Sequence, residues 1–281
     1  MATEDRYSAP LNVAPGRLIH AIGEPVRVGS LLWVFTDPHR GHEFAYNRWY
    51  ERDHYYAGCL IGAWNFAGSR WVATRRHKDA RLPAVTDMPF DRAAGSYACL
   101  YYLLDGHHDE WEAWSTPQVH ALYAADRGFQ SRTHYNTGFF RYDWRAYRDP
   151  DPIPLELALD HRYAGLVAQF VEPVEGSDGS AVDELMDHAL PGWLAGSPVA
   201  SVSSWTAVPL PASKPDFVPT DAGAERRILQ LFFLEEDPLD GWDHQRELVE
   251  QINRSGVARV VFSAPFIPTE VGTDRYVDQL W

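Results

Sequence analysis

Cysteine is scarce in this chain of 281 residues, which has only Cys59 and Cys99. Two cysteines exclude a disulfide framework, so we expect both to be buried thiols in a reducing compartment. Long apolar runs are also missing, because no stretch approaches the roughly 20 residues of a membrane-spanning helix. The first residues lack the basic and then apolar pattern of a signal peptide. We therefore expect a cytoplasmic protein without a membrane partner.

Positive charge is in short supply as well. The chain has 25 Lys and Arg against 39 Asp and Glu, giving a formal net charge of −14. This balance argues against nucleic acid as the main partner. The sequence has no phosphate-binding glycine loop, dinucleotide fingerprint, serine nucleophile elbow or Cys-x-x-Cys motif, so nucleotide, flavin and serine-hydrolase chemistries lack support. The cluster at 107–110 lacks zinc-site spacing, and we expect no metal.

What the chain does have is an internal repeat. Asp53, His54, Gly58, Leu60 and Trp71 reappear as Asp187, His188, Gly192, Leu194 and Trp205, each 134 positions later. A second block repeats at a spacing of 131, because the apolar run 100–103 matches 231–234. Matches at fixed spacing indicate that two similar halves form one body.

Hydrophobic periodicity predicts the same order of elements in both halves. The predicted strands are 30–38, 69–76, 96–106 and 137–144, then 165–174, 200–210, 226–237 and 258–266. The predicted helices are 41–58 and 108–128, then 180–194 and 240–256. We expect the first helix to end at Gly58, Pro117 to kink or split the second, and Ser180 to cap the third.

This order, β-α-β-β-α-β, is the ferredoxin-like motif, whose sheet carries helices on one face only. A second copy is the obvious cover for the other face. We therefore predict an α+β fold in which two tandem ferredoxin-like units form an intrachain dimeric α+β barrel. The predicted divisions are an arm at 1–28, a first half at 29–148, a linker at 149–162 and a second half at 163–281. A homodimer of the whole chain is possible.

The segment Asn47-Arg48-Trp49-Tyr50-Glu51-Arg52-Asp53-His54, with Gly58 downstream, resembles the dimeric α/β-barrel superfamily. The nearest likeness is to EthD-type and antibiotic-biosynthesis-type barrel domains. The resemblance implies a barrel over about residues 29–270. It leaves the activity open, because this superfold hosts isomerases, cyclases, cofactor-free monooxygenases, haem enzymes and binding modules.

His54 is the strongest candidate for chemistry. It lies among aromatic residues near a predicted helix end, where a histidine can line a pocket and exchange a proton. We predict His54 as general acid or base, with Tyr50 and Arg70 orienting a substrate oxygen. Asp53 diverges from it on a helix and is expected to pair with a nearby arginine, at 48, 52 or 70. The alternative is that the repeated histidines only contact carbonyl groups at the helix ends.

Several aromatic and polar residues could line a cavity for a flat or hydrophobic ligand. The predicted substrate contacts are Trp33, Asn47, Trp64, Trp71, Tyr101, His134, His188 and Trp205. The halves differ at the repeat positions of Tyr50, Arg70 and Trp64, which become Glu184, Ser204 and Pro198. We therefore expect the site in the first half.

The sequence favours a cofactor-independent lyase, isomerase or cyclase that acts on a small apolar metabolite with a carbonyl or phenol group. Two alternatives stay open. One is a binding or accessory barrel without chemistry. The other is an oxygenase, either cofactor-free or with haem held by an unaided histidine.

Overall fold

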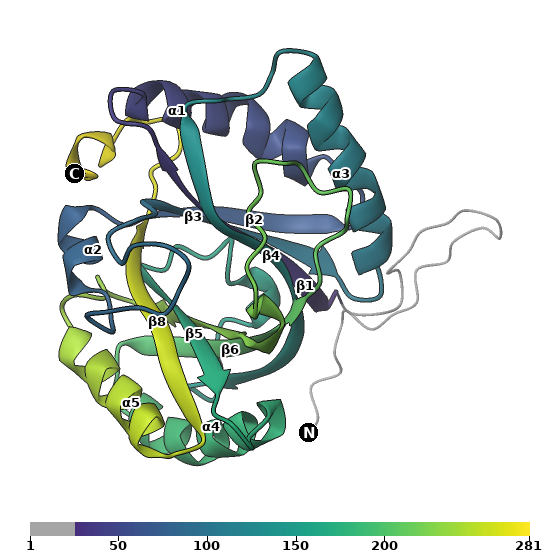
Figure 1. Cartoon of the computed structure of the whole chain (residues 1–281). Coiled ribbons are helices and arrows are strands. Elements are labelled where there is room, and N and C mark those ends of the chain that lie inside the picture. Colours follow the sequence, from purple (N-terminus) through teal and green to yellow (C-terminus); the bar gives the residue numbers. More distant parts are fainter. Residues whose placement is uncertain (1–25) are drawn as a thin grey trace, which may run out of the picture.

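A computed structural model describes residues 26–281, in which eight antiparallel strands close into one barrel with helices outside it (Figure 1). The strands are β1 (Val28–Pro38), β2 (Asn65–Val72), β3 (Tyr97–Leu104), β4 (Arg132–Tyr147), β5 (Gly165–Pro173), β6 (Val199–Val208), β7 (Ile228–Leu234) and β8 (Ala258–Pro268). They follow one another around the barrel in the order β1-β3-β2-β8-β5-β7-β6-β4. The predicted α+β class and antiparallel sheet are confirmed. The predicted arm lies outside the described residues up to residue 25.

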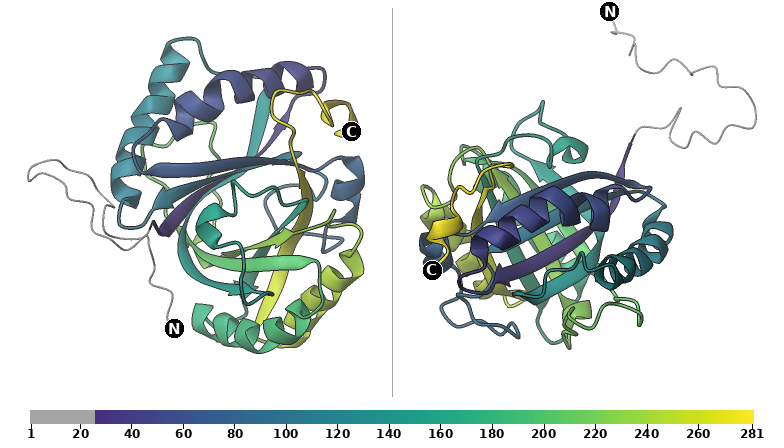
Figure 2. Two further views of the ribbon diagram at one scale, coloured as in Figure 1. Left: turned by 180° about the vertical axis from the view of Figure 1, so that it is seen from behind. Right: turned by 90° about the horizontal axis from the view of Figure 1, so that it is seen from above.

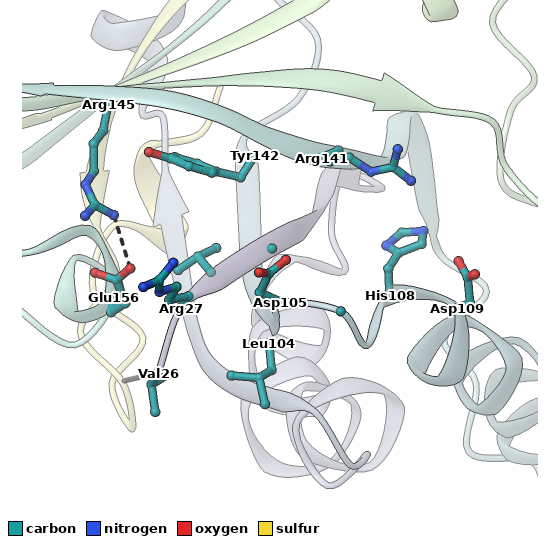
Figure 3. A pocket seen from close by; sticks show the side chains of 13 residues that line it. Val26, Arg27, Leu104, Asp105, His108, Asp109, Arg141, Tyr142, Arg145 and Glu156 are labelled. Carbon is teal, nitrogen blue, oxygen red and sulfur yellow. Dashed lines mark hydrogen bonds and ion pairs between the residues drawn. The ribbon is translucent and has the colours of Figure 1, made fainter. Parts of the chain in front are cut away.

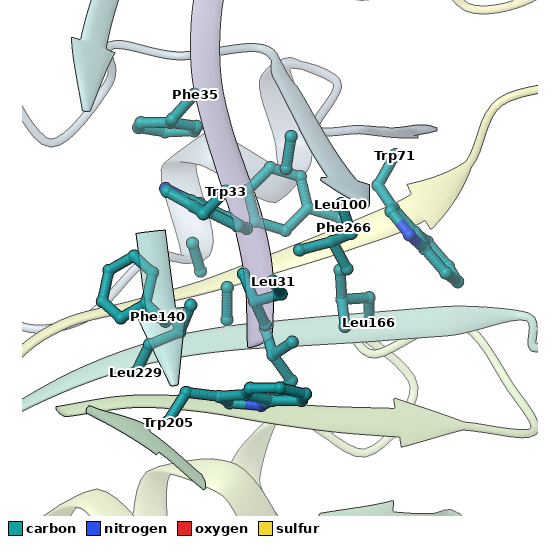
Figure 4. Close-up of a cluster of buried hydrophobic side chains, with 14 of the residues drawn as sticks. Leu31, Trp33, Phe35, Trp71, Leu100, Phe140, Leu166, Trp205, Leu229 and Phe266 are labelled. Atoms are coloured by element: carbon teal, nitrogen blue, oxygen red, sulfur yellow. The ribbon is translucent and has the colours of Figure 1, made fainter. Parts of the chain in front are cut away.

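Alternation along each strand divides the side chains between two environments. On β1, Leu31, Trp33 and Phe35 point into the barrel, whereas Leu32 and Val34 point outward under the helices. Aromatic and aliphatic side chains from both halves of the chain meet inside the barrel (Figure 4). The barrel interior is thus a packed core.

Helices cover two opposite sides of the barrel (Figures 1 and 2). On one side lie α1 (Glu43–Trp49), η1 (Tyr50–Leu60) and α3 (His108–Ala124), and on the other lie α4 (Gly179–Leu194) and α5 (Trp242–Arg254). A short helix, α2 (Arg75–Ala80), and the 3-10 turns η2 (Leu155–Leu157), η3 (Ala224–Arg226) and η4 (Val277–Gln279) complete the elements. No helix of the described chain has the length and apolar character needed to cross a membrane.

Three local predictions need correction. The first helix does not end at Gly58, because its second part, η1, is a π-helix that runs on to Leu60. Helix α3 continues through Pro117 without a break; its buried side chains, such as Trp111, hold it against the sheet. At α4 the N-cap is Asp178, whose carboxylate accepts a hydrogen bond from the Ala181 N–H at 3.1 Å.

Two long connections cross between the halves. The β2–β3 segment reaches the second half, where Leu82 pairs with Ser263 of β8 and Trp242 donates its indole N–H to the Ala80 carbonyl. The β6–β7 loop reaches the first half, where the Phe217 ring stacks on Tyr123 of α3 with ring centres 4.9 Å apart. This second loop forms a wall over the outer face of the first half.

The chain after β8 also returns to the first half and lies along α1 (Figure 1). Asn47 donates its side-chain N–H to the Thr273 carbonyl at 2.8 Å, and Glu51 accepts from the Gly272 N–H at 2.8 Å. Arg48 forms an ion pair with Asp274. These contacts fix α1 and the start of η1.

Candidate functional site

The π-helix η1 determines where His54 lies. A π-helix brings residues five apart onto one face, and such segments often occur at functional sites. The His54 ring stacks on Trp49, five residues earlier, with ring centres 4.5 Å apart and planes at 17°. The Tyr50 ring lies roughly perpendicular to the His54 ring, with the two ring centres 5.5 Å apart. A Cβ atom on Gly58 would lie 2.8 Å from the His54 ring, so glycine is required there to make room for it.

Strand β4 brings a second histidine and an arginine to the same place. Arg132 donates its Nε–H to Nε2 of His134 at 2.9 Å, which leaves the proton of that imidazole on Nδ1. The Nδ1 atom lies 2.9 Å from the Thr137 hydroxyl and therefore donates to it. Both nitrogens of His134 are thus occupied. In contrast, the His54 ring makes no hydrogen bond within residues 26–281.

These side chains line a cavity of about 90 Å³ between the helical layer and the outer face of the first-half sheet. Its walls are mainly apolar and include the crossing β6–β7 loop. The lining residues are Leu32, Val34, Tyr50, His54, Gly58, Cys59, Trp111, Ser115, Thr116, Val119, Arg132, His134, Thr137, Phe139, Leu210, Pro211, Lys214, Pro215, Phe217 and Val218. Not one of these residues is an aspartate or a glutamate.

Burial sets the protonation of the two histidines. Loss of hydration, together with the nearby Arg132 charge, lowers the pKa of His54 to about 3, although Asp53 acts in the opposite direction. Burial, Arg132 and His54 also lower the pKa of His134 well below its usual value. Both imidazoles are therefore neutral at neutral pH, but only His54 has a ring nitrogen that no described residue engages.

The predicted catalytic residues touch one another, but they do not converge on one cavity. Tyr50 separates the other two, because its ring meets His54 on one side and the Arg70 guanidinium on the other, 4.9 Å from the ring centre. Arg70 does not line the His54 cavity. Its guanidinium instead donates to the Asn47 side chain and lies 3.4 Å from Glu51. The expected partner of Asp53 is also corrected, since Asp53 pairs with Arg127 of the loop after α3.

Three predicted ligand contacts belong to the barrel core. Trp33 and Trp205 are fully buried there, and Trp71 is 2% exposed. Trp71 and Trp205 occupy matching places, since each donates its indole N–H to the serine two residues earlier, at 2.7 and 2.9 Å. Trp33 and Trp205 line no cavity among the described pockets, because their rings fill the barrel interior (Figure 4). Trp71 also lines a separate groove of about 620 Å³, together with Arg70.

The remaining predicted contacts are scattered. Tyr101 points outward under η1, and its hydroxyl bonds that of Tyr50 at 2.8 Å. Trp64 stacks on His107 with ring centres 3.7 Å apart. Asn47 holds the C-terminal segment, as described above. His188 is exposed on α4, where its Nδ1 bonds the Glu184 carbonyl one turn earlier at 2.7 Å. Of the predicted ligand contacts, only His134 reaches the His54 cavity.

Sequence reasoning missed Arg132 and the β6–β7 loop. A signal for Arg132 was present, because residues two apart on a strand face the same side and His134 had been selected. The run 132–136 was instead interpreted as a loop before the last strand of the first half. The loop offered no signal, since its role depends on a crossing between halves that local periodicity does not encode.

A larger groove lies elsewhere, around the start of β1 and the end of β3, with a volume of about 860 Å³ (Figure 3). Its charged side chains have both signs, and Arg145 forms an ion pair with Glu156 at 3.2 Å. His108 lines this groove, but its Nδ1 bonds the Ser30 hydroxyl at 2.8 Å. None of the predicted site residues faces this groove.

We tested whether the described residues could hold haem. His54 has free nitrogens, but a cavity of about 90 Å³ is smaller than the ~150 Å³ that accommodates one benzene ring. His134 has both nitrogens engaged, and His108 keeps Nε2 buried near Glu112. These histidines therefore do not fit haem as placed. Within residues 26–281 no group of three His, Cys, Asp or Glu side chains is arranged to hold a metal ion.

No protein-family model matches the chain, and no curated protein matches it by sequence. Solved structures share its fold. A protein provisionally assigned as the chlorite dismutase TA0507 superposes with a TM-score of 0.50 and 11% identity, over 91% of this chain and 100% of the other. A mutant chlorite dismutase from Candidatus Nitrospira defluvii superposes with a TM-score of 0.50 and 10% identity, over 90% of this chain and 96% of the other. A provisionally assigned monooxygenase from Fusobacterium nucleatum superposes with a TM-score of 0.47 and 9% identity, over 86% of this chain and 94% of the other. At such identities the first two similarities establish the fold alone.

Proposed function

We propose that this protein is an enzyme that removes a proton from a small substrate at His54. The site is the cavity under η1 and α3, outside the barrel. One observation carries the proposal. Among residues 26–281, the neutral imidazole of His54 has no hydrogen-bond partner and faces the same cavity as Arg132, which has no carboxylate partner there. A base beside a cation is the pairing that acid-base chemistry at a carbonyl or phenol needs.

The reaction begins as His54 takes the proton from a C–H bond next to the substrate carbonyl. The electron pair of that bond remains on the substrate, and the resulting oxyanion lies near the Arg132 guanidinium. Return of the proton to another carbon gives an isomerase, and loss of a leaving group gives a lyase. Apolar walls exclude water and strengthen the attraction between oxyanion and guanidinium.

A cofactor-free oxygenase is the second candidate. It shares the first step, after which the carbanion transfers electrons to O₂ and forms a carbon–oxygen bond. The apolar lining of the cavity favours this variant, because it would admit O₂ beside the substrate. Consumption of O₂ separates this reaction from an isomerase or a lyase.

The strand register supports a site in the first half only. Pro38 of β1 pairs with Arg132, and Pro173 of β5 pairs with Ala258. Two residues earlier on each strand, Thr36 pairs with His134 and Val171 pairs with Val260. The second half therefore has alanine and valine where the first half has arginine and histidine.

We further propose that the barrel is built from two tandem ferredoxin-like units, 29–148 and 163–281, joined by a linker at 149–162. The support is the strand order, in which β4-β1-β3-β2 are contiguous and β8-β5-β7-β6 repeat the same pattern. The likeness to EthD-type domains rests on the segment 47–54 alone.

The test measures turnover of small ketones and 2-oxo acids in D₂O by NMR, with O₂ followed by an electrode. We expect solvent deuterium to enter the substrate, and His54→Gln to lower the rate about 10²- to 10⁴-fold, the usual contribution of a general base. The matched control is His188→Gln, which alters the repeated histidine on the surface and should leave the rate unchanged.

The unfolding midpoint of both variants is measured alongside. If His54→Gln loses stability but keeps its rate per folded molecule, the histidine is structural and the proposal fails. Specific binding without deuterium exchange or O₂ uptake would instead identify a ligand-binding barrel.

A further inference from the structure

We propose that the His54 cavity selects a small aliphatic carboxylate, anchored by the guanidinium of Arg132. This inference rests on the proposed function, because it names the substrate class of that site. It adds a specificity-determining residue that the acid-base role of His54 does not require.

The first argument is the state of Arg132. Two of its nitrogens are used, since Nε donates to His134 and Nη1 donates to the Phe129 carbonyl. Nη2 is buried and has no hydrogen-bond partner within the described chain. A buried donor without a partner is costly unless a ligand fills the position. Arg132 also has no carboxylate partner among residues 26–281.

The aromatic surroundings of Arg132 fix its orientation. Its guanidinium carbon lies 4.8 Å from the ring centre of Trp49 and 4.9 Å from that of Phe217. Tyr123 adds a third ring at 5.6 Å. Rings stabilise the cation without accepting from Nη2, the nitrogen that has no partner within the described chain. The guanidinium is thus held ready for an acceptor in the cavity.

Charge around the cavity supports an anionic ligand. The protein carries a formal net charge of −14, yet none of the described residues that line this cavity is acidic. Lys214 of the β6–β7 loop adds a second cation, which donates to the Val218 carbonyl and also lacks a carboxylate partner within the described residues. A single carboxylate would neutralise one of these two cations, and the other would add to the attraction for an anion.

Size and wall chemistry narrow the class to carboxylates. A volume of about 90 Å³ is below that of a cavity of ~150 Å³ that binds benzene, so the ligand is expected to be an acid of a few carbon atoms. Apolar side chains such as Leu32, Val34 and Phe139 line the remainder, where an alkyl group would lie. A carboxylate oxygen can accept from the unpartnered Nη2 of Arg132, whereas a hydrated inorganic anion would gain little from apolar walls.

The test uses acetate as the probe and acetamide as its neutral isostere. Isothermal titration is combined with NMR of the His54 ring protons in the whole chain. We expect acetate to bind and shift those protons, and acetamide to bind at least tenfold more weakly. Arg132→Gln should weaken acetate binding at least tenfold and Arg132→Lys by less, because lysine keeps the charge without the planar edge.

The matched control is Arg141→Gln, an exposed arginine on the same strand, which should bind acetate like the parent. Three results would overturn the proposal. Arg132→Gln could bind acetate as tightly as the parent does, acetamide could bind as tightly as acetate, or chloride could give as strong a response as acetate. The proposal also fails if acetate does not shift the NMR signals of the His54 ring protons in the parent. This measurement does not depend on any variant being folded. His54→Gln separates the carboxylate site from the catalytic role of His54. We expect this variant to bind acetate whether or not His54 takes part in catalysis.

Discussion

His54 and His188 show at the scale of one residue how little a repeated motif says about role. Both follow an aspartate and precede a glycine by four positions. His54 stacks on a tryptophan beside a cavity, whereas His188 bonds a carbonyl of its own helix in solvent. The carbonyl-contact role considered for both histidines therefore describes His188 and not His54.

The buried state of His54 predicts how stability depends on pH. Its pKa in the folded protein is about 3, below the usual 6.5, because burial and Arg132 disfavour the charged ring despite Asp53. Between pH 6.5 and pH 3 the His54 ring is protonated in the unfolded chain but neutral in the folded protein. Stability is therefore lost as pH falls from 6.5 towards 3, by up to ~1.4 kcal/mol per pH unit for each such histidine. His134 acts in the same direction.

The measurement is urea unfolding at several pH values between 6.5 and 5, above the range where most carboxylates titrate. We expect His54→Gln to make the slope of unfolding free energy against pH shallower by up to ~1.4 kcal/mol per unit. His188→Gln should run parallel to the parent. A slope unchanged by His54→Gln would mean that the His54 ring is hydrated and titrates normally.

At the scale of elements, the π-helix determines which side chains lie beside His54. The α-helical spacing of three and four would place Asn47, Tyr50 and His54 on one face, and Tyr50 and His54 do share the cavity. The widened turn gives His54 a different neighbour, Trp49, which α-helical spacing does not select. Nothing in the local propensities signals a π-helix, because it forms where packing against the sheet favours the insertion.

The repeated glycines provide the prediction at this scale. A Cβ on Gly58 would strike the His54 ring at 2.8 Å, whereas one on Gly192 would meet nothing within 4 Å. Gly58→Ala should displace the imidazole and lower both stability and turnover. Gly192→Ala should raise the unfolding free energy by up to ~1 kcal/mol, since alanine favours helices more than glycine does. Thermal unfolding and the deuterium assay check both, and equal effects would contradict the predicted asymmetry.

At the scale of the molecule, the order of strands and helices could be predicted from the sequence because alternation and amphipathic spacing are local. The position of the cavity could not. The abundance of aromatic residues suggested a hollow barrel, but rings such as Trp33, Phe170 and Trp205 fill it from both halves. The cavity formed instead where the β6–β7 loop crosses from one half to the other, and such long-range contacts leave no period in the sequence.

The shared interior leads to the last prediction, which concerns the halves as separate bodies. Each half leaves large aromatic side chains uncovered when the other is removed, and each such ring loses roughly 1.5–3 kcal/mol of burial. The ladder between β4 and β6 would also open along residues 139–147. A chain of residues 26–150 should therefore fail to fold as a monomer, and so should 151–281.

The experiment inserts a protease site at the exposed linker residue Asp151 of the whole protein. The cleaved protein should elute as one complex and unfold in a single transition, because the two pieces still share one core. Each piece expressed alone should aggregate or pair with a second copy of itself, which would close the barrel with identical halves. A monomeric, cooperatively folding half would show that the interior is not the core on which both halves depend.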